Sequence, residues 1–188
     1  MAAVKASPTA MAAICASDVA ITKYAASAAG ANYSQFDTFT ALAADSTAMG
    51  KVAASEVAMT AVAASQVAMT AVAASQVAMA AVRASNTAMT ALEASTTAYN
   101  ALLASSLITR YNPANENTWR TDTVYSGSGI LVRLVSFQAS GNWYKLDGGA
   151  QVTLSGKDNK VVKAFNTKLE AYWVDYQEDA RGVYYIKC

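Results

Sequence analysis

The sequence contains no histidine, and this absence excludes several kinds of chemistry at once. Ser-His-Asp and Cys-His catalysis, histidine metal sites and the usual side-chain switch at physiological pH all need an imidazole ring. Cysteine is almost as scarce, because Cys15 and Cys188 are far apart and form neither a CxxC pair nor a zinc-binding pattern. We expect Cys15, which stands among alanine and isoleucine, to be a buried and inert thiol. Cys188 either pairs between subunits or ends a strand in its reduced form.

Charge is scarce in the first part of the chain and ordinary in the second. Residues 1–108 hold four Lys/Arg and five Asp/Glu, whereas residues 109–188 hold ten and eight, together with all three tryptophans. The net charge of +1 gives no drive toward nucleic acid or anionic membranes, so we predict neither as a partner. The chain therefore consists of two segments of different composition. The first is an arm rich in Ala, Ser, Thr, Val and Met, and the second is a charged, aromatic domain.

A ten-residue sequence repeat, here called a decad, fills the chain from residue 45 to about residue 105. Residues 55–64 read SEVAMTAVAA, residues 65–74 read SQVAMTAVAA, and residues 7–26 fit the same frame. We therefore interpret residues 7–26 as early repeats and not as a cleaved leader. Glycine and proline are missing from 51 to 112, and Ala and Met favour helix over strand. A fixed period of this kind predicts an elongated array of stacked or intertwined units.

The spacing of the larger side chains in the repeat is compatible with more than one backbone conformation. Met59 and Val62 are three residues apart, and Val62 and Met69 are seven residues apart. A stripe with these spacings repeats every ten residues, or three helical turns, and so has fewer residues per turn than a straight helix. A continuous helix carrying this stripe needs a supercoil pitch of about 70 Å, tighter than the usual ~140–210 Å. The alternatives are an overwound bundle, or a short helix in each decad that restarts at its serine. Val and Thr also recur every five residues, so a β-solenoid is a third possibility. The abundance of Ala, which is poor in strands, argues against it.

The repeat is apolar nearly all round, which predicts that identical chains share its burial in a homo-oligomeric bundle. A trimer is the expected form, by analogy with fibrous adhesins. Residues 57–82 carry no charge and are long enough to span a bilayer. Because Ser, Thr or Gln recurs every few residues and no aromatic belt or basic flank frames the run, we predict no membrane insertion.

Breaks in the repeat set the predicted domain boundaries. Residues 1–27 are early repeats and an attachment segment, residues 28–44 are a bend, knob or docking surface, and residues 45–111 form the helical arm. Residues 112–117, with sequence NPANEN, are typical of a linker. Residues 118–188 alternate β-branched and aromatic runs with turn signals, which predicts six or seven antiparallel strands in a small sandwich or barrel. The runs that we interpret as strands are residues 129–137, 143–146, 150–156, 160–165, 168–175 and 182–187. The predicted fold class is α+β.

Candidate functional groups are sparse in the predicted β domain. Its carboxylates stand near turns or strand ends and nothing pairs them as acid and base, so we predict no enzymatic activity, no metal site and no cofactor. Trp143 and Tyr144 follow a Ser-Gly-Asn turn signal and are the candidate binding residues. At a hairpin tip they would stack on sugars, and a position in the core is the competing interpretation.

The decads resemble the decapeptide arrays of tail-fibre and related virion proteins of tailed bacteriophages, as in SNTAMTAL at residues 85–92. A compact β-rich domain often follows in those proteins, and residues 180–188, ARGVYYIKC, resemble its close. The resemblance implies a homo-oligomeric fibre or decoration on the virion, with other virion proteins and a host-surface glycan or protein as partners. The alternatives are a bacterial surface or secreted adhesin, an ice-binding protein that presents threonines 60, 70 and 90, and a fibre-borne glycosidase, which needs a carboxylate pair.

Overall fold

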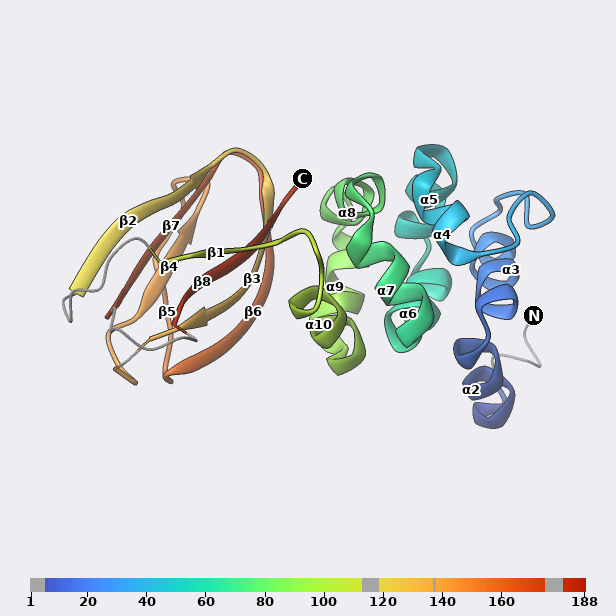
Figure 1. Ribbon diagram of the computed structural model, residues 1–188, viewed down its shortest axis with the longest axis horizontal. Helices are drawn as coiled ribbons and strands as arrows, with labels where there is room; N and C mark the ends of the chain where they lie inside the picture. Colours follow the sequence, from blue (N-terminus) through green and yellow to red (C-terminus); the bar gives the residue numbers. More distant parts are fainter. Residues whose placement is uncertain (1–5, 113–118, 137, 175–180) are drawn as a thin grey trace. The chain divides into compact units, whose positions relative to one another are not determined.

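The chain forms two separate units, which the computed structural model describes at residues 6–112, 119–136, 138–174 and 181–188. Unit 1, Met1–Leu107, is helical in its described part, and unit 2, Ile108–Cys188, is built from β-strands (Figure 1). Helices and antiparallel sheets are thus segregated along the chain. The predicted α+β fold class is confirmed.

Unit 1 is a succession of short helices. From residue 45 onward each helix occupies one decad, beginning just after the opening Ser or Asp and ending at the ninth or tenth residue. The early repeats before residue 27 are helical in the same way. In chain order the helices are α2 (Pro8–Ala16), α3 (Asp18–Ala28), α4 (Phe39–Ala44), α5 (Ser46–Ala54), α6 (Glu56–Ala64), α7 (Gln66–Ala74), α8 (Gln76–Arg83), α9 (Asn86–Ala94) and α10 (Thr96–Leu103).

The serine that opens each decad interrupts one helix and begins the next. The backbone of Ser65 is extended, with φ −95° and ψ 116°, and its Oγ accepts a hydrogen bond from the Ala68 N–H at 3.2 Å. This is the geometry of a helix N-cap, and Asp45 caps α5 in the same way through its carboxylate. The restarted helix is therefore the geometry that forms, and the continuous helix and the β-solenoid are both wrong for this chain.

Helices three apart in the chain pack against one another, so that three decads complete one turn of the array. α5 packs on α8, α6 on α9 and α7 on α10. The serines also join successive turns, because Ser75 Oγ donates to the Ala43 carbonyl at 2.7 Å and Ser95 Oγ donates to the Ala63 carbonyl at 2.5 Å, each 32 residues earlier. Those carbonyls belong to last turns of helices, where backbone oxygens lack partners within the helix.

Methionine and valine side chains fill the interior of unit 1. Met59, Met69 and Met79 are 0% exposed within the single chain, as are Val62 and Val72. Because every helix restarts, a Met and the Val three residues later return to the same inward face in each decad of residues 45–84, and the apolar stripe does not rotate as it would along a continuous helix. One copy therefore does bury its large apolar stripe, contrary to the prediction from sequence. The homo-oligomer itself stays a prediction.

The register break predicted at residues 28–44 is a loop followed by a short helix. The chain turns at Gly30, whose φ of 66° suits glycine. Phe36 and Phe39 then enter the core. The Asp18 carboxylate accepts a hydrogen bond from the Phe39 N–H at 2.7 Å, at the start of α4. Since α4 packs on α7 as the later helices pack on theirs, the break inserts a loop without ending the array.

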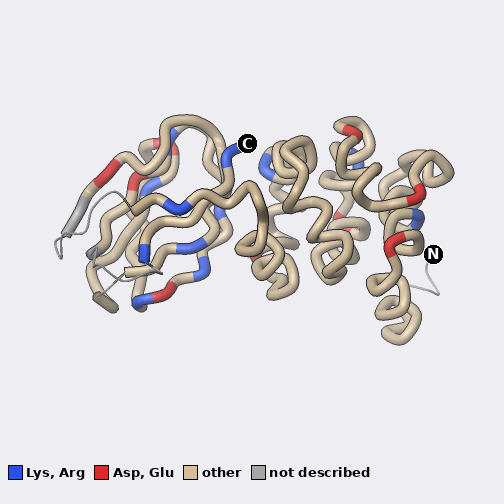
Figure 2. Tube along the Cα trace, in the orientation of Figure 1, with Lys and Arg blue, Asp and Glu red and all other residues tan. Residues whose placement is uncertain are grey.

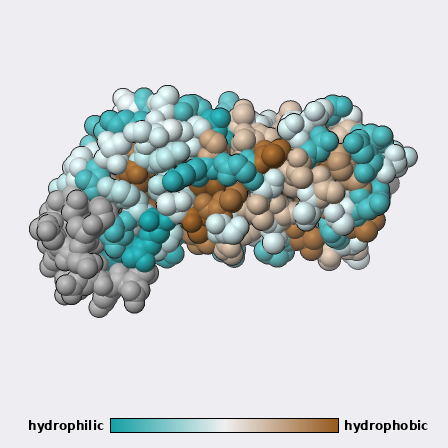
Figure 3. All heavy atoms as spheres, turned by 45° about the horizontal axis from the view of Figure 1, so that its top comes forward, coloured by the Kyte–Doolittle hydropathy of each residue, from teal (hydrophilic) through white to brown (hydrophobic). Residues whose placement is uncertain are grey.

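The surface of unit 1 is weakly polar and carries few charges. Figure 2 shows how much sparser its charged residues are than those of unit 2. In Figure 3 the helical side shows much tan and white, with smaller teal and brown areas. No single helix among the described residues is long and apolar enough to cross a membrane. α6 and α7 meet those criteria only as a pair, and they are bent by 100° at the break between them.

The helical arm ends earlier than residue 111, where we predict its end. β1, Ile108–Tyr111, is a strand that pairs with β8, Gly182–Lys187, and it belongs to unit 2. Its sequence ITRY is rich in residues that favour strands, and a partner strand is present. Apart from Asn112, the predicted linker at residues 112–117 lies outside the described residues.

The described residues of unit 2 form two antiparallel four-stranded sheets. Sheet A has the order β1-β8-β3-β6 and sheet B has the order β2-β7-β4-β5. Strands are predicted in all of these regions except β1 and β2. The remaining strands are β2 (Trp119–Ser126), β3 (Gly129–Val135), β4 (Trp143–Leu146), β5 (Val152–Thr153), β6 (Asp158–Phe165) and β7 (Lys168–Val174).

The two sheets share one hydrophobic core. Leu131 and Phe165 reach it from sheet A, and Leu169 and Trp173 reach it from sheet B. Trp173 is 0% exposed. Because successive side chains of a strand point to opposite faces, the residues between these inward positions lie on the outer faces of the sheets.

Candidate functional site

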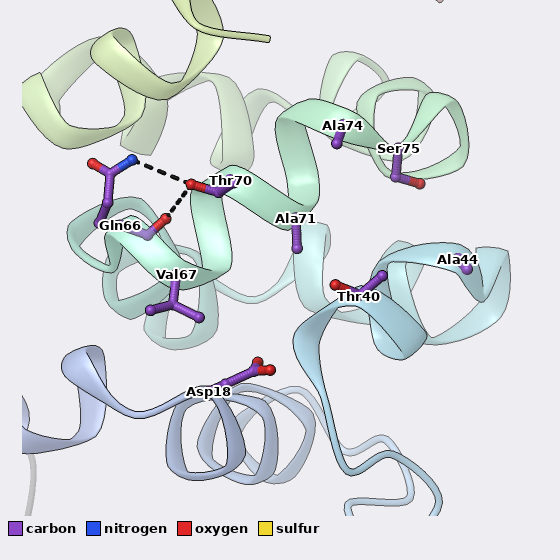
Figure 4. Close-up of a pocket in the computed structure, with 9 residues that line it drawn as sticks. All are labelled: Asp18, Thr40, Ala44, Gln66, Val67, Thr70, Ala71, Ala74 and Ser75. Carbon is purple, nitrogen blue, oxygen red and sulfur yellow. Dashed lines mark hydrogen bonds between the residues drawn. The ribbon is translucent and has the colours of Figure 1, made fainter. Parts of the chain in front are cut away.

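Successive turns of unit 1 leave shallow grooves between their helices. One of these, about 650 Å³, lies between α4 and α7 (Figure 4). Similar grooves of about 630 Å³ and about 470 Å³ lie between α5 and α8 and between α6 and α9. In all three grooves, the later decad contributes its third, sixth, seventh and tenth residues. The side chains at these positions lie outside the core.

The groove between α4 and α7 has one carboxylate and no acid–base pair among its lining residues. Figure 4 shows Asp18 facing Val67 across it, and the Asp18 carboxylate is already engaged with the N-terminus of α4. Thr70 Oγ1 donates to the Gln66 carbonyl at 2.8 Å and accepts from Gln66 Nε2 at 3.2 Å. These polar groups serve the helices themselves, and the groove holds no second ionisable group for proton transfer.

Threonines ten residues apart do not share a surface. Because three decads make a turn, Thr70 lines one groove with Thr40, whereas Thr60 and Thr90 line another. The groove between α5 and α8 has Gly50 and Ala80 at the corresponding positions. The threonine series considered for ice binding is thereby divided between two faces of the array.

Cys15 borders a groove of about 400 Å³ beside Met11 and Val57. Its thiol points to the Ala61 carbonyl at 3.6 Å, and burial raises the pKa of the Cys15 thiol. Since the thiolate is the reactive form, a raised pKa agrees with the inert thiol expected from the sequence. Cys15 is nevertheless half-buried and not fully buried.

The two predicted binding residues lie on opposite faces of β4. Tyr144 points into the core of unit 2, where it is 5% exposed, so its ring cannot serve as a platform for a ligand. Trp143 is half-buried on the outer face of sheet B. The alternation of side chains along a strand separates the two neighbours. The prediction of a shared binding site is therefore wrong for Tyr144, whereas Trp143 remains a candidate.

Trp143 forms an aromatic platform with Tyr172 of β7, a residue that the sequence alone does not single out. The two residues are directly opposite in the sheet, and their rings are stacked with centroids 5.5 Å apart and planes at 18°. Lys145 lies on the same face, with Nζ 5.1 Å from the centroid of the Trp143 ring. Alternation along residues 168–174 could have assigned Tyr172 to an outer face, but its register against β4 is not visible in the sequence.

Asp158 is held by an ion pair between neighbouring strands. Arg133 of β3 donates two hydrogen bonds to its carboxylate, at 2.7 and 2.6 Å. These bonds hold the pKa of Asp158 below its usual value. The described residues contain no group of three or more His, Cys, Asp or Glu that could hold a metal ion. Three further carboxylates of the predicted β domain lie outside the described residues, namely Asp175, Glu178 and Asp179.

Asp147 fastens the turn after β4 to the turn between β6 and β7. Its carboxylate accepts hydrogen bonds from the N–H groups of Asn166, Thr167 and Lys168, at 2.9, 2.6 and 3.1 Å. Burial acts to raise the pKa of Asp147, but these donors outweigh it and the pKa is lowered. Asp147 is thus a structural charge, and not merely a solvated loop charge as its place near a turn predicts.

No protein-family model matches the chain, and no curated protein matches its sequence.

Proposed function

We propose that this chain is a structural and adhesive component of a bacteriophage virion, a tail or head fibre or a decoration. Its helical arm is a spacer, and the β-sandwich of unit 2 presents a binding surface. The observation that carries the proposal is how the repeat uses its residues, since the serines join the helices and the Met and Val side chains fill the core. Such an array suits a scaffold. The resemblance of the decads to those of tail-fibre proteins supports the same conclusion.

The segmented array makes the arm a broad spacer with modest reach. Packed helices lie about 10 Å apart, so each turn of three decads adds about 10 Å of length. The same three decads in one continuous helix would add about 45 Å. The serine bonds between turns, such as that from Ser75 to Ala43, oppose sliding of one turn over the next. Reach is therefore set by the number of decads, and stiffness by the joints between turns.

A homo-oligomer, with three chains as the expected number, is part of the proposal. Because each arm buries its own Met and Val side chains, the reason for association is no longer a shared core. Multivalency supplies another reason, since linked copies of a weakly binding domain hold a surface far more firmly than one copy does.

Immunogold electron microscopy with antibodies against the purified chain tests the proposal. We expect label on virus particles released by the bacterium that produces the chain, and none on particles from a strain lacking its gene. Label confined to the surface of intact cells would overturn the proposal in favour of a bacterial adhesin. A thermal-hysteresis assay with the purified chain should show no effect, and a clear effect would support ice binding instead.

A further inference from the structure

The outer face of sheet B combines an aromatic platform with charged and hydroxyl side chains. On β4, Tyr144 and Leu146 pack against or within the core, so Trp143 and Lys145 lie on the other face. On β7 the same alternation places three residues outward, namely Lys168, Glu170 and Tyr172. Cross-strand pairing sets Trp143 opposite Tyr172 and Lys145 opposite Glu170, so these groups form one contiguous surface.

Hydroxyl groups flank the two stacked rings on neighbouring strands. Thr153 of β5 is paired with Trp143, and Thr121 of β2 is paired with Tyr172. Both threonines are exposed. Trp143 and Tyr172 are themselves half-buried, so part of each ring reaches solvent. A ring surface bordered by hydroxyls matches a sugar, whose C–H face is apolar and whose edge carries hydroxyls.

The charges of this face leave one ammonium group without a carboxylate partner among the described residues. Lys168 Nζ is 2.8 Å from Glu170 Oε1, so these two charges balance each other. Lys145 lies beside the Trp143 ring and carries the excess positive charge of the platform. An acidic group bound next to the rings would meet this ammonium.

We propose that the outer face of sheet B binds an acidic glycan. A pyranose ring packs on the Trp143–Tyr172 platform, its carboxylate pairs with Lys145, and its hydroxyls bond to Thr121, Thr153 or Glu170. This deepens the adhesive part of the proposed function and rests on it.

Two other classes of partner fit the face less well. A stable protein interface buries about 800 Å² on each side around an apolar centre, and here the apolar part is two rings framed by Thr, Lys and Glu. Nucleic acid needs several cations along its backbone, whereas this face has one excess cation and a carboxylate, Glu170. Glu170 can accept hydrogen bonds from sugar hydroxyls.

Isothermal titration calorimetry on the purified full chain tests the proposal with oligogalacturonate as the acidic probe and dextran oligosaccharide as the neutral one. We expect oligogalacturonate to bind at least tenfold more tightly than dextran, and more weakly as salt is raised. Trp143→Ala and Tyr172→Ala should each reduce the affinity for oligogalacturonate at least tenfold. Lys145→Gln should remove the preference for the acidic probe. Lys160→Gln on sheet A and Tyr33→Ala in unit 1 are matched controls that should change neither affinity.

Three results would overturn the glycan site. The first is the absence of oligogalacturonate binding at millimolar concentration. The second is binding that Trp143→Ala leaves unchanged while near-ultraviolet circular dichroism shows a folded variant. The third is tighter binding of a single-stranded oligonucleotide, which would assign the face to nucleic acid. None of these results affects the immunogold test, so failure of the glycan site is distinguishable from failure of the virion assignment.

Discussion

Ser75 has two tasks in the arm, and they involve different atoms. Its Oγ accepts from the Ala78 N–H at 3.2 Å, which caps α8, and its hydroxyl hydrogen goes to the Ala43 carbonyl at 2.7 Å, which joins two turns. Capping is predictable from sequence because it is local, and Ser is a preferred N-cap. The bond to Ala43 is not predictable in this way, since it depends on how many decads make one turn.

Substitution of Ser75 separates the two tasks. We expect Ser75→Ala to lower the free energy of unfolding of unit 1 by about 2–3 kcal/mol, about 1–2 for the lost cap and about 1 for the lost bond between turns. Ser75→Asp should retain the cap, as Asp45 shows in α5, yet still be destabilising because it has no hydrogen to donate to Ala43. Urea denaturation followed by circular dichroism measures both.

The control is Thr96→Ala, at the exposed first residue of α10, which should change the free energy of unfolding by less than about 0.5 kcal/mol. If Ser75→Asp proves as stable as the native chain, the serine bonds between turns contribute nothing and the described stacking loses its main polar support.

At the scale of elements, the sequence predicts helices in the decads and six of the eight described strands, because both signals are local. β1 and β2 escape prediction for a physical reason. β1 continues directly from the helical array, and β2 reads WRTDTVYS, a polar run that becomes a strand through its long pairing with β7. Register between strands is likewise invisible, which is why Tyr172 escapes notice while Trp143 does not.

The turn held by Asp147 makes unit 2 sensitive to acid. Its pKa is lowered in the folded chain, so its stabilising effect is fully present above the unfolded value of about 3.9 and is lost as pH falls through the folded value. We expect Asp147→Asn, which tolerates the local φ of 56°, to be less stable at pH 7 and to lose less stability between pH 4 and pH 2.

Chemical denaturation of unit 2 across that pH range, followed by tryptophan fluorescence, measures this effect. Asp37 is an exposed carboxylate in unit 1, so Asp37→Asn should leave the loss of stability of unit 2 at low pH as it is in the native chain. An unchanged pH dependence in Asp147→Asn would mean that other carboxylates carry the acid sensitivity.

At the scale of the whole molecule, composition predicts a repeat arm followed by a charged, aromatic domain, and the chain divides into two compact units at Leu107. Which surface buries the decads is harder to predict, because an apolar repeat can be buried by another chain or by the next turn of the same chain. Ser75 and Ser95 donate to carbonyls 32 residues earlier, which joins successive turns, and the Met and Val side chains are buried within the single chain. The chain therefore buries its own repeat. Ten residues per three helical turns strains a continuous helix, and restarting at every serine relieves that strain.

The array should tolerate loss of a whole decad. Deletion of residues 75–84 brings Ser85 to 32 residues after Ala43, so each later serine again meets an alanine carbonyl. We expect the shortened chain to keep its helicity per residue and to unfold cooperatively. Deletion of residues 75–79 alone leaves half a decad out of frame and should lower both helicity and the melting temperature. Equal effects of the two deletions, measured by circular dichroism, would contradict a modular array.

The distance between residues 60 and 90 tests the segmented array most directly. Thr60 and Thr90 are exposed and line one groove, so they stand on neighbouring helices of successive turns. Spin labels can be attached at Thr60→Cys and Thr90→Cys after Cys15→Ala and Cys188→Ser, and diluted with unlabelled chain so that only distances within one chain contribute.

Double electron–electron resonance should then give a separation of roughly 10–25 Å, the spacing of packed helices plus the label arms. A separation of about 45 Å, which thirty residues of one continuous helix would span, would contradict the segmented array.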